Sequence, residues 1–170
     1  VKRFWAIEFA SWSEKFDSEA IMPILNKIGQ FLSNTQIRNI VCQQTNKFDM
    51  RTIMNEGKIA LIKISKGMLG EENSELIGSM IITKVYQAAM MRASIHEDQR
   101  RPFYFYVDEF QNFATDTFGN ILSEARKYKL SLTIGHQYMG QLSAPIRSTV
   151  FGNIGSIISF RVGMDDAGPL

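Results

Sequence analysis

An adjacent pair of carboxylates, Asp108 and Glu109, is the pattern in this chain with the clearest chemical potential. The pair directly follows the apolar run 103–107, FYFYV. A continuous run of this kind is typical of a strand buried on both faces of a parallel sheet. Open α/β sheets bind ligands beyond the carboxyl ends of their strands. We therefore expect Asp108 and Glu109 at the ligand-binding edge of a sheet.

Two neighbouring carboxylates at a strand end suit metal-assisted phosphoryl transfer, as at the Walker B site of nucleotide motors. There the first carboxylate helps to hold Mg²⁺, and the second orients or polarises the water that attacks the γ-phosphate. The pattern predicts these two roles for Asp108 and Glu109 in turn. For the octapeptide 103–110 alone, a strand that leaves the core into an acidic turn explains the residues equally well.

Two later β-rich runs carry polar groups that the same chemistry could use. Gln137 follows the run 130–135, and its side-chain amide could sense the γ-phosphate or hold the attacking water. Arg161 lies in a third run, 156–162. Parallel strands place their carboxyl ends on one edge, so these groups can converge with the carboxylates. The alternatives are a solvated glutamine and an arginine that extends along the surface.

Arg126 lies on the helix expected after the carboxylate pair, within SEARKYKL. Its planar guanidinium matches phosphate oxygens and could serve as an arginine finger. Spacing alone favours a solvated helix end, where Arg126, Lys127 and Lys129 complement the helix dipole. His136 has no cysteine or second histidine nearby, which favours a polar neighbour of Gln137 over a metal ligand.

One part of a nucleotide site is missing from the sequence. No segment matches GxxxxGK[ST], the loop whose amides and lysine cradle phosphates. The nearest approaches, at 56–59 and 67–70, lack this spacing. We therefore expect the chain alone to bind nucleotide weakly and to show no ATPase activity.

The composition is that of an ordinary globular domain. The 170 residues are 45% hydrophobic and 21% charged, with a net charge of +2, which argues neither for nor against nucleic acid as a partner. The single cysteine, Cys42, excludes an internal disulfide and suggests a small buried side chain in a reducing compartment. No apolar run approaches the roughly 18 residues of a membrane span, and a signal-peptide pattern is lacking.

The apolar pattern also predicts the elements that must position these groups. Helical spacing predicts helices at 2–16, 19–32 (with Pro23 in its early turn), 48–55, 72–97 and 116–128. β-rich composition predicts strands at 58–65, 103–107, 130–135 and 156–162. Strands that alternate with helices predict a parallel sheet and an α/β fold class.

Three segments, in this order, resemble the FtsK/HerA-like motor ATPases of conjugation and type IV secretion: FYFYVDEFQNFA, SEARKYKLSLTIGHQ and FGNIGSIISFRVGMDDA. With the strand and loop GKIALIKISKGMLG, the resemblance covers about residues 57–168, and it is closest to type IV coupling proteins of the TraG/TraD kind. It implies a three-layer RecA-like P-loop NTPase fold with a parallel sheet. Residues 1–170 would form a single domain, the C-terminal portion of the motor, with a mainly helical part at 1–56. The fold would be incomplete, because the family places the Walker A strand and loop upstream of Val1.

Carried over by position, the resemblance implies Asp108 for the metal, Glu109 as the catalytic carboxylate and Arg126 as a finger that reaches a neighbouring subunit's nucleotide. It implies that Gln137 couples the γ-phosphate to movement and that Arg161 contacts or senses the nucleotide. The chain would look like an excised piece of an ATPase that uses ATP and Mg²⁺, forms a ring (usually a hexamer) and translocates DNA. Type IV secretion components would be its partners. The protein would be cytoplasmic, at the inner face of the membrane through regions outside this chain.

Two other functions fit the same residues. A secretion-assembly ATPase or a HerA-like repair translocase keeps the enzyme class but moves protein or double-stranded DNA. A degenerate motor fold, kept as a non-catalytic binding platform, belongs to a different class. A GxxxxGK[ST] loop upstream of Val1 would separate a motor from a platform.

Overall fold

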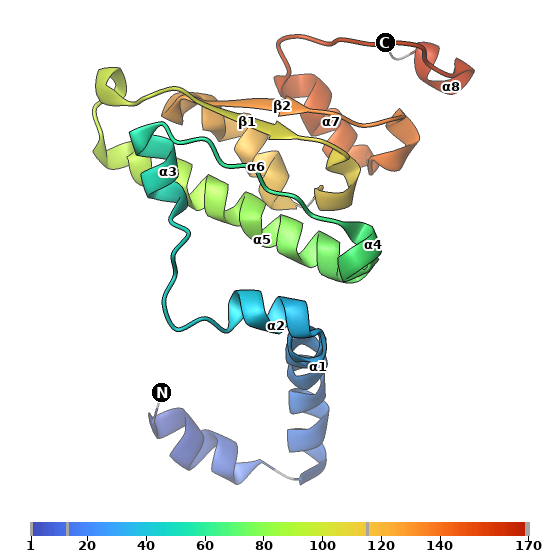
Figure 1. The fold of residues 1–170 in the computed structure, drawn as a ribbon. Helices are drawn as coiled ribbons and strands as arrows, with labels where there is room; N and C mark the ends of the chain where they lie inside the picture. Colours follow the sequence, from blue (N-terminus) through green and yellow to red (C-terminus); the bar gives the residue numbers. More distant parts are fainter. Residues whose placement is uncertain (1, 13, 115, 169–170) are drawn as a thin grey trace.

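The computed structural model describes residues 2–12, 14–114 and 116–168. A body, defined as residues 50–154, holds the sheet and the main core, and an N-terminal arm of α1 (Glu14–Ser33) and α2 (Thr35–Val41) projects away from it (Figure 1). The other α-helices are α3 Met50–Glu56, α4 Lys66–Leu69, α5 Glu71–Met90, α6 Asp116–Glu124, α7 Ala144–Asn153 and α8 Met164–Ala167. Within the described residues, no helix combines the length and the apolarity needed to cross a membrane.

The sheet consists of β1 (Phe103–Val107) and β2 (Leu130–Ile134) in the described residues. The strands are parallel, with Phe103 opposite Leu130 and Val107 opposite Ile134, so their carboxyl ends are level. Helix α6 lies in the connection between them, as a parallel pair requires a crossover. The predicted strands at 103–107 and 130–135 and their parallel pairing are confirmed. The fold is compatible with the α/β class.

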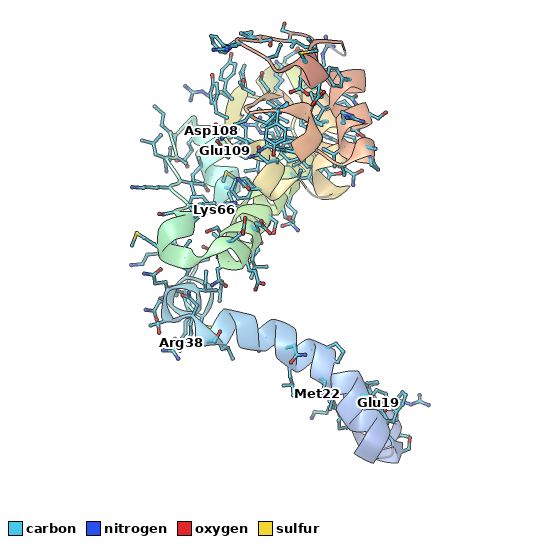
Figure 2. All side chains as sticks on the ribbon, turned by 90° about the vertical axis from the view of Figure 1, so that its right-hand side faces the viewer. Glu19, Met22, Arg38, Lys66, Asp108 and Glu109 are labelled. Atoms are coloured by element: carbon cyan, nitrogen blue, oxygen red, sulfur yellow. The ribbon has the colours of Figure 1, made fainter. Side chains whose placement is uncertain are left out.

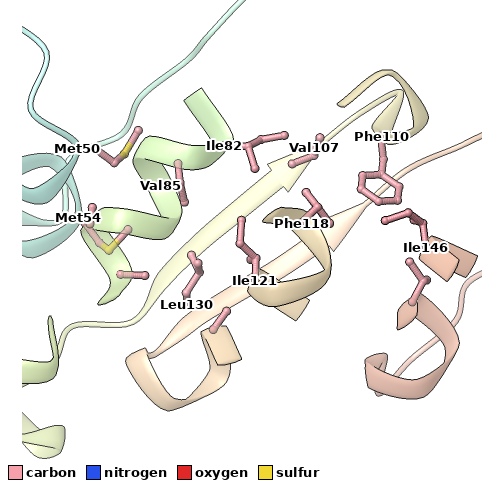
Figure 3. Packing of buried hydrophobic residues seen from close by; sticks show 14 of the residues in the cluster. Met50, Met54, Ile82, Val85, Val107, Phe110, Phe118, Ile121, Leu130 and Ile146 are labelled. Carbon is pink, nitrogen blue, oxygen red and sulfur yellow. The ribbon is translucent and has the colours of Figure 1, made fainter. Parts of the chain in front are cut away.

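One face of the sheet carries the core and the other face is open. Val107 and Leu130 are buried among side chains of α5, α6 and α7, including Ile82, Ile121 and Ile146 (Figure 3). The alternate residues Tyr104 and Tyr106 are 62% and 71% exposed. The prediction of a strand buried on both faces is therefore wrong, because no described element covers the second face. Aromatic residues continue the apolar run on the exposed side.

Two predicted strands do not form in the described residues. Residues 58–65 and 156–162 form neither helix nor strand and belong to no sheet. Ile59 and Leu61 are 90% and 94% exposed, and Ile158 and Phe160 are 84% and 91% exposed. Figure 1 shows the first segment running from α3 to α4 in the same direction as β1. The strand predictions are wrong here because neither segment has a backbone partner.

The helix predictions need smaller corrections. Helix α1 begins at Glu14 and contains Pro23 in its interior, so the predicted start at residue 19, with Pro23 in the early turn, is wrong. Helix α2 was not predicted, although Asn34 caps it by accepting from Gln36 N and Ile37 N. Residues 4–11 form short π and 3-10 turns in place of a regular helix, and the long helix ends at Met90 with 3-10 turns after it. Cys42 is exposed, which contradicts the buried side chain expected for it.

A buried arginine ties three parts of the body together. Arg92 is 1% exposed and donates to Met54 O at 2.8 Å, Arg101 O at 2.9 Å and Tyr128 O at 3.0 Å. Its Nε donates to Asn55 Oδ1 at 3.1 Å. These partners come from α3, from the entry to β1 and from the 3-10 turn η6 (Ala125–Tyr128). The guanidinium thus donates to backbone carbonyls that would otherwise lack a hydrogen-bond partner inside the body.

Candidate functional site

The carboxyl ends of β1 and β2 are joined by backbone hydrogen bonds beyond the sheet. Gly135 N donates to Val107 O at 2.9 Å, and Phe110 N donates to Gly135 O at 2.9 Å. A Cβ at position 135 would lie 3.3 Å from Asp108 Oδ1, so glycine allows this close approach. The two loops that leave the sheet therefore stay in contact, and the side chains that follow each strand are held near one another.

Glu109 has a backbone conformation that non-glycine residues rarely adopt. Its φ and ψ angles are 50° and 44°, in the left-handed region. The Asp108 side chain supports this turn, since Asp108 Oδ1 accepts from Glu109 N at 2.9 Å. Such backbone conformations persist only where surrounding contacts enforce them, and they are concentrated at functional sites.

Both oxygens of the Glu109 carboxylate accept from side-chain amides. Gln137 Nε2 donates to Oε1 at 2.7 Å, and Gln111 Nε2 donates to Oε2 at 2.5 Å. The amides of Gln137 and then Gln111 hold the pKa of the Glu109 carboxyl below its ordinary value, and the positive charge of Lys66 adds to this effect. The carboxylate is thus favoured in its ionised form. The predicted convergence of Gln137 with the carboxylate pair is confirmed.

Gln111 and Lys66 are site residues that the sequence reasoning missed. Lys66 Nζ donates to Asn112 Oδ1 at 2.7 Å and to Glu71 Oε1 at 3.0 Å. Figure 2 shows Lys66 below Asp108 and Glu109 in that view. The available signals were a lysine at the tip of a loop that follows a β-rich run, and a glutamine two residues after the glutamate. Neither pattern is specific, because polar residues are common in loops.

The 163–166 turn lies at the same end of the sheet. Asp166 is buried, and its Oδ1 and Oδ2 accept from Met139 N at 3.3 and 3.2 Å, two residues after Gln137. Arg161 is exposed in the unpaired segment 156–162. The side chain of His136 is partly buried, and its Nδ1 atom has no hydrogen-bond partner among the described residues.

Arg126 lies at the opposite end of the sheet from the carboxylates. It belongs to η6, which leads into the amino end of β2, and its side chain is exposed. Arg100 Nη1 donates to Lys127 O at 2.5 Å, and the Arg100 guanidinium lies 5.5 Å from the centre of the Tyr128 ring. Arg126 therefore lies on a turn that Arg92 and Arg100 both support, at the end of the sheet remote from this chain's own Glu109.

The donor set fits Mg²⁺ in part. Asp108 is exposed at the strand end, where its carboxylate is accessible to an ion. Mg²⁺ sites in phosphoryl-transfer enzymes often use one or two carboxylates together with substrate phosphates. In the part of the chain that the structure describes, no cluster of three or more histidine, cysteine or acidic side chains is placed to hold a metal by itself. The site thus offers one metal ligand and an ionised carboxylate, but no loop that cradles phosphates.

A groove of about 740 Å³ elsewhere in the molecule does not contain this chemistry. It lies between residues 40–51, residues 61–64 and α5, and its walls are mainly apolar, with Ile77, Met80 and Ile81 among them. Neither Asp108 nor Glu109 lines it.

Comparison with known proteins adds no relative: no family model matches the chain, and neither a curated protein nor a solved structure matches it.

Proposed function

We propose that this chain is the C-terminal portion of a RecA-like motor ATPase, which hydrolyses ATP to move DNA in conjugation or type IV secretion. One observation carries the proposal. At the level carboxyl ends of two parallel strands, Gln137 Nε2 donates to Glu109 Oε1 at 2.7 Å. A catalytic carboxylate hydrogen-bonded to an amide from the loop after the neighbouring strand is a suitable arrangement for linking the chemistry of a phosphate to movement of a loop.

The residues divide the work of hydrolysis between them. Asp108 would hold Mg²⁺, which when bound neutralises charge on the phosphate oxygens. Glu109, kept ionised by its two amides, would orient the attacking water and accept its proton. Each Glu109 oxygen accepts from one amide and keeps a second lone pair that can accept from the attacking water. Of the two amides, Gln137 is the one that we expect to respond to the phosphate, since its side chain is exposed and reaches Glu109 from the loop after the neighbouring strand.

The phosphates need groups that this chain lacks. The GxxxxGK[ST] loop is expected from another region of the full-length protein. The open edge of β2 and the unpaired segment 156–162 support this expectation, because a further parallel strand would satisfy both. In this proposal the third layer of the fold covers the face that carries Tyr104 and Tyr106.

Arg126 is proposed to act on a neighbouring subunit in a ring. Its exposed position at the far end of the sheet from Glu109 supports action in trans. Loss of such a finger lowers the rate on the order of 10³–10⁵-fold. Mixing Arg126→Ala subunits with subunits whose phosphate loop is broken should restore part of the activity. Failure of confirmed mixed assemblies to recover at any ratio would assign Arg126 to the solvated helix end.

The direct test compares Glu109→Gln with the unchanged full-length protein. We expect DNA-stimulated ATP hydrolysis to fall at least about 100-fold while nucleotide binding is kept, because the substitution removes the proton acceptor and preserves the shape. The 170-residue chain alone should show no hydrolysis. Full-length protein without hydrolysis in any form would favour the non-catalytic platform. Hydrolysis stimulated by a secreted protein and not by DNA would favour a secretion-assembly ATPase.

A further inference from the structure

We propose that Lys66 is a positioning residue that holds Glu109 in its working orientation, an inference that rests on the proposed ATPase function. Lys66 Nζ donates to Asn112 Oδ1 at 2.7 Å, across 46 positions of sequence. Asn112 N in turn donates to Glu109 O at 3.0 Å. The first residue of α4 is thus connected, through one side chain, to the backbone of the catalytic carboxylate.

A second contact fixes the same turn, which we call η5 (Phe110–Phe113). A Cβ at Gly78 of α5 would lie 2.2 Å from the Phe113 ring, so the ring is packed directly against the α5 backbone. Phe110 is fully buried at the other end of η5. The packing of Phe113 and Phe110 sets the depth of the turn in the body. The Lys66–Asn112 hydrogen bond adds a polar contact from a different element.

The left-handed backbone at Glu109 explains why such a contact matters for function. A non-glycine residue with φ of 50° returns to ordinary conformations unless its neighbours prevent it. If η5 became looser, Glu109 could relax and its carboxylate would move away from the Gln137 amide. Because catalysis depends on the position of the reacting groups, a shift of about 1 Å can cost 10²-fold in rate.

The plainer interpretation is a surface ion pair between Lys66 and Glu71. These side chains are 41% and 73% exposed, and Lys66 Nζ lies 3.0 Å from Glu71 Oε1. Exposed pairs of this kind contribute little to stability and would not affect the rate of a reaction at Glu109. The bond to Asn112 distinguishes the two interpretations, because only positioning through η5 predicts a kinetic effect shared by Lys66 and Asn112.

The experiment is a double-mutant cycle in the full-length protein. Lys66→Met and Asn112→Leu should each lower kcat for ATP by about 10-fold to 100-fold, with KM changed less than about twofold. The double variant should lose no more than the worse single variant, because both changes remove one interaction. Lys66→Arg and Asn112→Asp keep a donor and an acceptor and should retain most of the activity. Without nucleotide, backbone amides of 110–113 should exchange hydrogen faster in Lys66→Met.

Lys58→Met is the matched control. Lys58 lies near the other end of the same extended segment and pairs with Glu56 at 2.6 Å, so its loss should leave kcat and exchange at η5 unchanged. Unchanged kcat in Lys66→Met, where Glu109→Gln abolishes hydrolysis, would overturn the inference. A raised KM with normal kcat would also overturn it, because Lys66 would then bind the nucleotide itself. No effect of Glu109→Gln would instead refute the proposed function.

Discussion

Two β-rich segments of this chain form strands of a sheet, and two other β-rich segments do not. Residues 103–107 and 130–134 form a parallel sheet in which Val107 and Leu130 are 8% and 3% exposed. Residues 58–65 and 156–162 have a comparable composition, yet Leu61 and Phe160 are 94% and 91% exposed and the segments join no sheet. A β-rich composition therefore produces a strand only where a backbone partner and an apolar layer are both present.

The neighbours of each pair explain the difference. Strands β1 and β2 are joined through α6, whose Phe118 and Ile121 fill the space under the sheet. No described element offers the same cover to 156–162. Under the proposed function, a strand from another part of the protein would lie beside β2, and residues 156–162 would pair with that strand. An isolated two-stranded sheet is marginal in water, so the helical layer must stabilise the present one.

The largest expected difference between the two regions comes from phenylalanine truncation. Phe110 is fully buried and its ring centre lies 4.2 Å from that of Phe118. Phe110→Ala should lower the free energy of unfolding by about 3–5 kcal/mol, or abolish a cooperative transition in urea. Phe160→Ala makes the same chemical change in the unpaired segment and should alter it by less than about 0.5 kcal/mol. Equal losses would show that the C-terminal segment is packed in solution.

A smaller effect is expected from adding one methyl group to helical glycines. Gly78→Ala places a Cβ 2.2 Å from the Phe113 ring and should destabilise the chain by about 1–3 kcal/mol, because η5 must move. Gly29→Ala in α1 meets no atom within 4 Å and should instead stabilise that helix by up to about 1 kcal/mol. Thermal unfolding followed by circular dichroism measures both. A stabilising Gly78→Ala would contradict the close packing of η5 on α5.

The smallest effect is expected from a charge placed in the unpaired segment 156–162. Ile158→Lys should change the stability of the 170-residue chain by less than about 0.5 kcal/mol, since Ile158 is 84% exposed. In the full-length protein the same change should cost more than about 2 kcal/mol if the segment becomes a buried strand. Lys63→Ala, also in an unpaired segment, serves as a control for a charge change at a surface position. Equal small effects in both proteins would mean that 156–162 stays outside the sheet.

Features that depend on near neighbours along the chain can be predicted from the sequence alone. The apolar run before Asp108 and the β-rich run before Gln137 were both correctly predicted to form strands. The parallel pairing followed from helix–strand alternation, because a crossover helix leaves few other arrangements. The same rule predicts that Gln137 and Asp108 lie at one edge of the sheet, beyond the carboxyl ends of its strands.

Strand pairing and the support of the site depend on contacts between distant parts of the chain. Nothing local distinguishes 58–65 from 103–107 as a strand, because hydrogen-bond partners come from elsewhere in the chain. The left-handed backbone of Glu109, its bond to Gln111 and the Lys66–Asn112 contact depend on loops that meet in space. Arg92 was likewise unforeseen, since a buried arginine is stable only where several carbonyls converge on it. Composition and periodicity describe each segment's preference, but long-range partners determine whether that preference is satisfied.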